Sequence, residues 1–265
     1  MRSYRIAASS LPEQPHLVKG AMITKPSISV AAPIVIATLG LWTMTFAQKP
    51  RVPPGGHLAV VADERLAALR NTPDPSAHLL RRLSRGRFVS IRGSARSREG
   101  LLFYRVVVTR RTIGWLQGEA VIAAWRSGDD ERLMHLIDGA DEFDRVARAR
   151  IFLETFPHSA LRPKVLLSYG DAAEEAAGRL SREAERRFER RELPKAGAPE
   201  FSYFLNYSGL DRYNRQGVTF AFDRATRQFH YEGRAWREIL RRYPGSAEAR
   251  AARQRLDRPA GNAAK

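Results

Sequence analysis

The chain contains no cysteine, and this absence excludes several kinds of chemistry. Disulfide bonds, cysteine-ligated metal sites and thiol peptidase chemistry all require that residue. No two of its six histidines have the i, i+4 helical spacing of a zinc peptidase: His16, His57, His78, His135, His158 and His230. The chain also has no phosphate-binding glycine loop and no nucleophile elbow around a serine. We therefore expect no catalytic residues, no metal site and no cofactor.

Acidic residues are also scarce relative to basic ones. The sequence has 28 Asp and Glu against 45 Lys and Arg, which gives a formal net charge of +17. Such a basic surface favours anionic partners, for example nucleic acid, lipid headgroups or acidic cell-wall polymers. An arginine-rich protein without such a partner would have the same composition, and the charge alone does not separate the two interpretations.

Long hydrophobic runs are absent except near the N-terminus. Lys25 precedes an apolar run over Ile28–Trp42, and small residues lead to Ala47. This order is typical of a secretory signal peptide cleaved after Ala47, with Met22 as an alternative start of translation. Residues 28–47 are also long enough for an uncleaved membrane anchor. Both interpretations predict that 1–47 is a leader and that the remaining chain is extracytoplasmic, either periplasmic or secreted.

Short strands are predicted after a Pro- and Gly-rich linker at 48–56. In the stretch Leu101–Leu116, Tyr104, Val106 and Val108 alternate with more polar residues, which indicates a strand with one buried face. Further short apolar groups lie upstream, and turn residues separate them. We expect these strands to form a small closed β-barrel over 57–124.

The predicted strands and loops carry these motifs: Leu69-Arg70, Pro73 with Pro75, Leu80 with Leu83, Arg85-Gly86 before Val89-Ser90-Ile91, Tyr104-Arg105-Val106, and Gly114-Trp115-Leu116. The pattern resembles a bacterial Src-homology-3 (SH3b) domain. The resemblance implies an SH3-like barrel that binds a peptide or a cell-wall component.

Five residues of this region are candidate ligand-binding residues: Tyr104, Trp115, Arg92, Arg96 and Arg98. We expect the Trp115 ring to pack inside the barrel, with a position at the rim of a ligand groove as the alternative. The three arginines lie in one predicted loop. They form either an anion-binding patch or an ordinary solvated loop.

The second half, 127–257, has the pattern of a mainly helical domain. Asp129 or Asp130 is expected to cap a helix, Asp141 to start another, and Ser159 to cap a third. Residues 181–191 are expected to continue that third helix as a charged, exposed segment. Alternating aromatic residues around a break at 223–228 predict an inserted β-hairpin, and 258–265 is expected to be a frayed tail.

Two corners in this half have the same local sequence. Phe156-Pro157-His158-Ser159-Ala160 matches Tyr243-Pro244-Gly245-Ser246-Ala247, in each case a helix end, a proline stop and a serine before the next helix. The corner resembles that of tetratricopeptide-like envelope proteins, which implies helical hairpins that bind a protein. Aromatic residues between 203 and 231 form either part of the core or a peptide groove.

The sequence as a whole predicts an α+β protein with an SH3-like barrel followed by a tetratricopeptide-like helical domain. The function it favours is that of a non-enzymatic extracytoplasmic binding or scaffold protein. Its partners would be a protein or a cell-wall component, and it would meet a membrane only through an uncleaved N-terminal segment. The alternatives are a component of a cell-wall hydrolase and a nucleic-acid- or anion-binding protein.

Overall fold

The computed structural model describes residues 55–190 and 197–257. The expected signal peptide or anchor, the linker before Gly55 and the expected tail lie outside these residues. Residues 48–265 belong to one compact unit. Within the described ranges, no helix combines the length and the apolar character needed to cross a bilayer.

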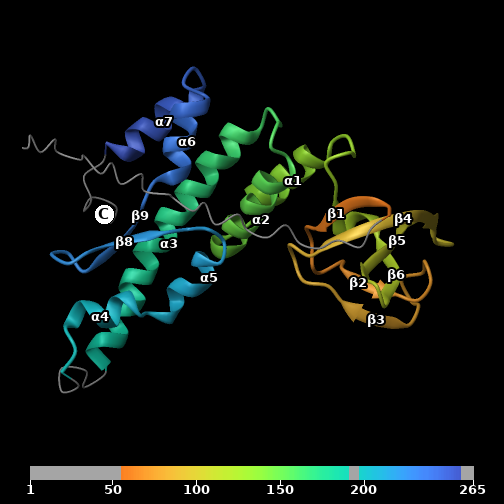
Figure 1. The fold of residues 1–265 in the computed structure, drawn as a ribbon, viewed down its shortest axis with the longest axis horizontal. Coiled ribbons are helices and arrows are strands. Elements are labelled where there is room, and N and C mark those ends of the chain that lie inside the picture. The colour runs from red at the N-terminus through yellow and green to blue at the C-terminus, as the bar shows by residue number, and fades with distance from the viewer. Residues whose placement is uncertain (1–54, 191–196, 258–265) are drawn as a thin grey trace, which may run out of the picture. The chain divides into compact units, whose positions relative to one another are not determined.

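The first part of the fold is one antiparallel sheet of seven strands (Figure 1). Its strands are β1 (His57–Val61), β2 (Ala68–Arg70), β3 (Leu79–Arg82), β4 (Phe88–Arg96), β5 (Leu102–Thr109), β6 (Thr112–Gln117) and β7 (Val121–Ile122), with the short 3-10 helix η1 (Gly118–Ala120) before β7. Their order across the sheet is β3-β2-β6-β5-β4-β1-β7. The expected alternation in β5 is confirmed, because Tyr104, Val106 and Val108 are all buried.

The expected closed barrel is wrong. The described strands form an open sheet with β3 at one edge and β7 at the other, and these two edges do not pair. The edge strand β7 has only 2 residues, and the other edge strand, β3, has 4 residues that are all exposed. The coarser expectation of an α+β protein, with an antiparallel sheet followed by helices, is confirmed.

The β4 strand is longer than its sequence indicates. It continues through Arg96, with Ser94 opposite Tyr104 and Ala95 opposite Phe103 in β5. Arg92 and Arg96 therefore lie on a strand and not in the expected loop, and only Arg98 lies in the turn that follows. Pairing with a strongly apolar neighbour extends the strand through residues of low β-propensity.

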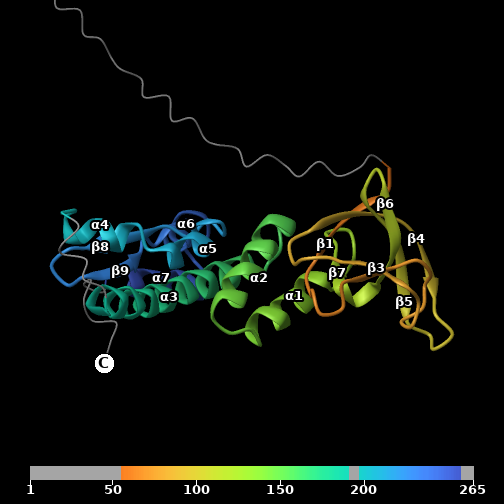
Figure 2. The ribbon, with the colours of Figure 1, turned by 90° about the horizontal axis from the view of Figure 1, so that it is seen from below.

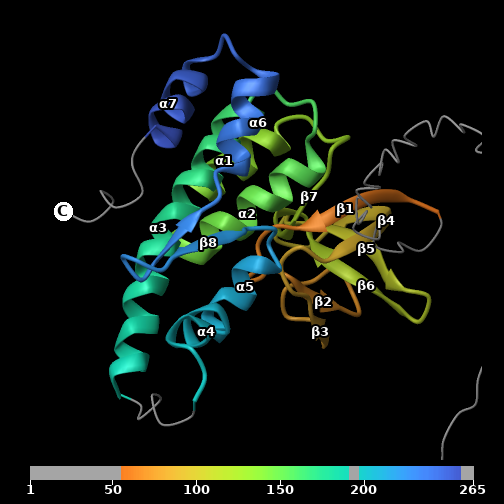
Figure 3. The same ribbon diagram turned by 60° about the vertical axis from the view of Figure 1, so that its left-hand side comes forward.

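The helical part consists of α1 (Asp129–Asp138), α2 (Glu142–Thr155), α3 (Arg162–Arg190), α4 (Glu200–Leu205), η3 (Ser208–Leu210), α5 (Asp211–Asn214), α6 (Arg234–Arg242) and α7 (Ala247–Leu256). The expected β-hairpin is confirmed as β8 (Phe220–Asp223) with β9 (Gln228–Tyr231). The long helix α3 contacts α2, β9, α6 and α7, and the hairpin lies beside it (Figures 2 and 3).

The expected helix caps are only partly confirmed. Ser246 caps α7 by accepting a hydrogen bond from the amide of Ala249 at 3.2 Å. Ser159 lies ahead of the first residue of α3, Arg162; its hydroxyl accepts from the Leu161 amide and donates to Asp130 of α1. Neither aspartate caps α1, because Gly128 is its N-cap and the buried Asp129 carboxylate bonds elsewhere.

Buried apolar side chains form two clusters. One lies within the sheet. The other gathers helical side chains, but it also includes Val60, Ala62 and Ile122 from the sheet region. The division into two domains at 57–124 and 127–257 stays a prediction, although side chains from both segments share this second cluster.

Candidate functional site

A cavity of about 570 Å³ opens on the sheet beside β1, β4 and β5. Its lining consists of Gly55, Gly56, His57, Ile91, Arg92, Gly93, Ser94, Tyr104 and Trp125. Three aromatic side chains and one guanidinium from distant parts of the chain therefore meet at one surface.

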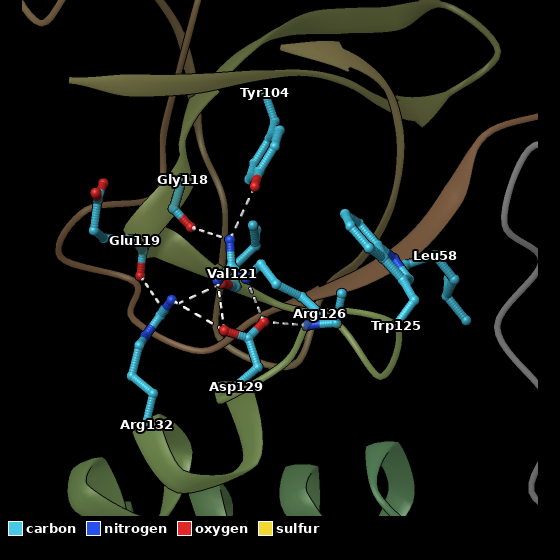
Figure 4. Close-up of polar contacts among 10 residues, drawn as sticks. Leu58, Tyr104, Gly118, Glu119, Val121, Trp125, Arg126, Asp129 and Arg132 are labelled. Atoms are coloured by element: carbon cyan, nitrogen blue, oxygen red, sulfur yellow. Dashed lines mark hydrogen bonds and ion pairs between the residues drawn. The ribbon is translucent and has the colours of Figure 1, made fainter. Parts of the chain in front are cut away.

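Trp125 follows β7 and is an exposed aromatic residue of this cavity. Its residue is 49% exposed, and its indole Nε1–H donates to the Leu58 carbonyl at 3.0 Å (Figure 4). The His57 ring lies 5.1 Å from it between centroids, tilted by 46°. The hydrogen bond and the neighbouring ring fix the indole while one face stays open to solvent.

Tyr104 is held in place by Arg126. The Tyr104 ring is almost fully buried, at 8% exposure, and its hydroxyl accepts a hydrogen bond from Arg126 NH1 at 3.1 Å. The guanidinium carbon also lies 5.8 Å from the centre of the Tyr104 ring. These two contacts with Arg126 fix the orientation of the Tyr104 side chain.

Arg126 is in turn fixed by Asp129 at the start of α1 (Figure 4). The Asp129 carboxylate accepts from Arg126 Nε and NH2, each at 2.7 Å, and from the Ala123 amide at 2.8 Å. Burial lowers the pKa of Arg126, but its hydrogen bonds to Asp129 and Tyr104 outweigh burial and leave the pKa raised. Arg132 adds a bond to the Glu119 carbonyl at 2.6 Å. This network joins the end of the sheet to α1.

The backbone on the other side of the cavity is closely packed. Gly56 has a φ of +106°, and a Cβ there would collide with the Ile91 carbonyl. The Ser90 hydroxyl donates to the Gly55 carbonyl at 2.5 Å. The register of β4 against β5 shifts between Ile91 and Gly93, and this bulge redirects the strand where it lines the cavity.

The structure brings together two of the five candidate residues. Tyr104 and Arg92 line the cavity, whereas Trp115, Arg96 and Arg98 do not. Arg96 instead donates to the Gly100 carbonyl at 2.7 Å.

The expected inward position of Trp115 is wrong. In β6 the buried positions are Gly114 and Leu116, so the alternation places Trp115 on the opposite, half-buried face.

Three residues of the site, His57, Trp125 and Arg126, were not among the candidates. The indole of Trp125 bonds a carbonyl 67 positions earlier in the chain, and no local pattern encodes that distance. A large aromatic residue three positions after the last strand of the sheet is the local signal that the sequence offers.

The aromatic residues of the helical part mainly form core. Phe204, Tyr207, Phe229 and Tyr231 are all buried. A smaller cavity of about 390 Å³ lies over Tyr203, Phe204 and Tyr207. Most of these aromatic residues therefore belong to the core and do not line a peptide groove.

In the ranges 55–190 and 197–257, no three His, Asp or Glu side chains gather in a way that could hold a metal ion. Comparison with known proteins adds no further assignment: no family model, no curated protein and no solved structure matches this chain.

Proposed function

We propose that this protein is a non-enzymatic binding or scaffold protein that acts outside the cytoplasm. Its ligand, a peptide or a cell-wall component, binds in the cavity between Tyr104 and Trp125. The helical part binds a protein partner. In this proposal the sheet is a variant of the SH3-like fold, and the α2–α3 and α6–α7 pairs are tetratricopeptide-like hairpins.

The exposed ring of Trp125 carries this proposal. An indole that is 49% exposed leaves a large apolar surface in water, yet its hydrogen bond to Leu58 holds it in one orientation. A ring fixed in this way loses little conformational freedom when a ligand covers it. Such rings stack on sugar rings and on the apolar faces of peptides.

The charges at the cavity favour a ligand with an acidic group. Arg92 lines the cavity, whereas the Arg126 guanidinium that bonds the Tyr104 hydroxyl is already paired with Asp129. A guanidinium forms paired, charge-assisted hydrogen bonds with carboxylates. The combination of aromatic rings with the Arg92 guanidinium suits a peptide that carries a carboxylate, including the peptides of a cell wall.

The test is sedimentation with purified peptidoglycan, using the chain from Gln48 onward. Trp125→Ala should reduce binding at least about tenfold, since truncating a central aromatic contact costs 2 kcal/mol or more. Trp115→Ala is the matched control, because it removes the same side chain from the sheet but away from the cavity. Equal loss in both variants would count against the cavity as the site.

A parallel titration with duplex DNA at several salt concentrations examines the nucleic-acid alternative. Wall binding that is insensitive to salt, with no DNA binding, supports the proposal. DNA binding that weakens steeply with salt and is unaffected by Trp125→Ala would favour the basic surface as the functional one.

A further inference from the structure

Arg148 of α2 is a buried cation without an anionic partner. The residue is only 7% exposed. Its NH1 donates to the Leu136 carbonyl at 2.6 Å, and its Nε has no hydrogen-bond partner. No carboxylate of the described residues lies within ion-pair distance of it. An isolated buried charge is costly, so this arrangement needs a physical reason.

Arg162 provides a comparison within the same chain. It is buried to a similar degree, at 9% exposure, but it pairs with Glu238 at 3.1 Å. The carboxylates that act electrostatically on Arg148 are engaged by other arginines: Asp144 pairs with Arg85 at 2.7 Å, and Asp63 pairs with Arg65 at 2.6 Å. Arg148 therefore feels these two carboxylates only at longer range, and no carboxylate of the described residues pairs with it directly.

The Arg148 side chain lines a cavity of about 550 Å³. Arg65 and Arg212 line the same cavity. The Arg212 guanidinium lies over the Phe143 ring at 5.2 Å and forms no ion pair with a described carboxylate. Three acidic residues line the cavity: Asp144 and Glu142 each bind an arginine, the latter Arg179 at 3.0 Å, and Asp141 forms no ion pair among the described residues. Two unpaired guanidiniums, those of Arg148 and Arg212, therefore face one unpaired carboxylate. The local balance of unpaired charge is therefore positive.

The first turn of α2 faces the same cavity, since residues 141–144 belong to its lining. Asp141 is the N-cap residue, but its side chain makes no capping hydrogen bond. The amides at the beginning of a helix have no intrahelical acceptor, and the helix dipole places partial positive charge there. The first turn also carries Glu142 and Asp144, but both are paired with arginines, so the free amides of this 14-residue helix still add an attraction for an anion beside Arg148.

We propose that this cavity binds a small oxyanion, a carboxylate or a phosphate group, between Arg148, Arg212 and the N-terminus of α2. The bound anion neutralises the buried guanidinium. The site shares no lining residue with the Tyr104–Trp125 cavity, and its occupancy does not depend on the function proposed for that cavity.

The experiment is a titration of the full chain with sodium phosphate and, in a separate arm, with sodium succinate. Binding is measured by calorimetry and by the shift in melting temperature, against sodium chloride at equal ionic strength. We expect a saturable response, because a ligand that binds only the folded state raises its stability with concentration. Arg148→Met should abolish this response. Its melting temperature without anion should not fall, because methionine keeps the apolar volume and removes the buried charge.

The matched control is Arg237→Met on α6, which removes one exposed arginine that has no ion pair in the described ranges. It should respond as the unaltered chain does. If Arg148→Met fails to fold, Arg212→Met replaces it, with affinity expected to fall by about tenfold for the loss of one charge-assisted contact. A response to phosphate alone or to succinate alone identifies the preferred group. The proposal is overturned if neither anion gives a saturable response, or if the arginine variants respond as the unaltered chain does.

Discussion

Ser181 shows how a single side chain can join two elements of this protein. It lies on α3 and is 5% exposed, at the start of a segment whose many charged residues made it appear wholly exposed in the sequence. Its hydroxyl donates to the Ala177 carbonyl and accepts from the Phe229 amide of β9, each at 2.8 Å. The expectation of an exposed extension over 181–191 is therefore wrong at this position, because the β8–β9 hairpin covers it.

Replacing this serine should weaken the attachment of the hairpin. Ser181→Ala leaves the Phe229 amide buried without an acceptor, which costs about 1–3 kcal/mol of the free energy of unfolding. Urea denaturation measures the difference. Ser127→Ala is the control, because Ser127 is exposed, and its effect should stay within about 0.5 kcal/mol. If the two variants are equally stable, the bond to the hairpin contributes nothing.

Asp144 makes the stability of the fold depend on pH. Its hydrogen bond with Arg85 holds the pKa of the Asp144 carboxyl below its ordinary value of 3.8. The unfolded chain therefore takes up this proton at a higher pH than the folded chain does. The stabilisation is fully present at pH values well above 3.8 and is lost as the pH falls through the folded-state pKa.

Asp144→Asn should consequently be less stable than the unaltered chain at pH 7, and the difference should shrink as the pH approaches 2. Thermal melts across this range provide the measurement. The stability of this variant should still fall somewhat in acid, because the hydrogen bond with Arg65 also lowers the pKa of Asp63. Asp257→Asn removes an exposed carboxylate without an ion pair among the described residues, and it should leave the pH profile unchanged. A constant deficit for Asp144→Asn at every pH would contradict the ion-pair explanation.

At the scale of elements, the contact between α3 and α6 depends on a glycine. A methyl group placed on Gly170 of α3 would lie 2.8 Å from Cδ1 of the Trp236 indole, well inside van der Waals contact. Trp236 is 4% exposed and cannot move away into solvent. The helix tolerates the low helical propensity of glycine because the missing side chain makes room for the ring.

Two glycines of the same helix should therefore respond in opposite directions to the same substitution. Gly170→Ala should destabilise the protein by about 1–3 kcal/mol through overpacking. In Gly178→Ala the new methyl group meets only the end of the Arg182 side chain at 3.6 Å. That change should stabilise by about 0.5–1 kcal/mol through helix propensity. Chemical denaturation of both variants decides the point, and a stabilising effect at both positions would mean that the α3–α6 contact is loose.

The elements that could be predicted from the sequence are those with a strong local pattern. The alternation in Leu102–Thr109, the break at 223–228 and the proline corners all depend on adjacent residues. The end of β4 could not be predicted, because Gly93 and Ser94 join the strand only through pairing with β5. The residues of the cavity could be predicted only in part for the same reason. Tyr104 belongs to a strand with a clear alternating pattern, whereas Trp125 is positioned by a hydrogen bond to the carbonyl of Leu58.

At the scale of the whole molecule, the question is whether the sheet and the helices are independently stable. Val60, Ala62 and Ile122 lie in the same buried cluster as the helical side chains. The Asp129 carboxylate of α1 accepts from the Ala123 amide, and Arg85 pairs with Asp144 of α2. A fragment that begins at Ser127 would expose that apolar surface and deprive Asp129 of Ala123 and Arg126.

We therefore expect residues 48–265 to unfold in one cooperative transition. Circular dichroism at 222 nm follows mainly the helices. In a Trp236→Phe variant of 48–265, the remaining tryptophans are Trp115 and Trp125, so fluorescence follows the sheet alone. Coincident midpoints in urea support a shared core, because different probes agree in a two-state transition. Two separate midpoints, with a fragment 127–265 as stable as the helices of the longer chain, would instead establish the two independent domains that the sequence predicts.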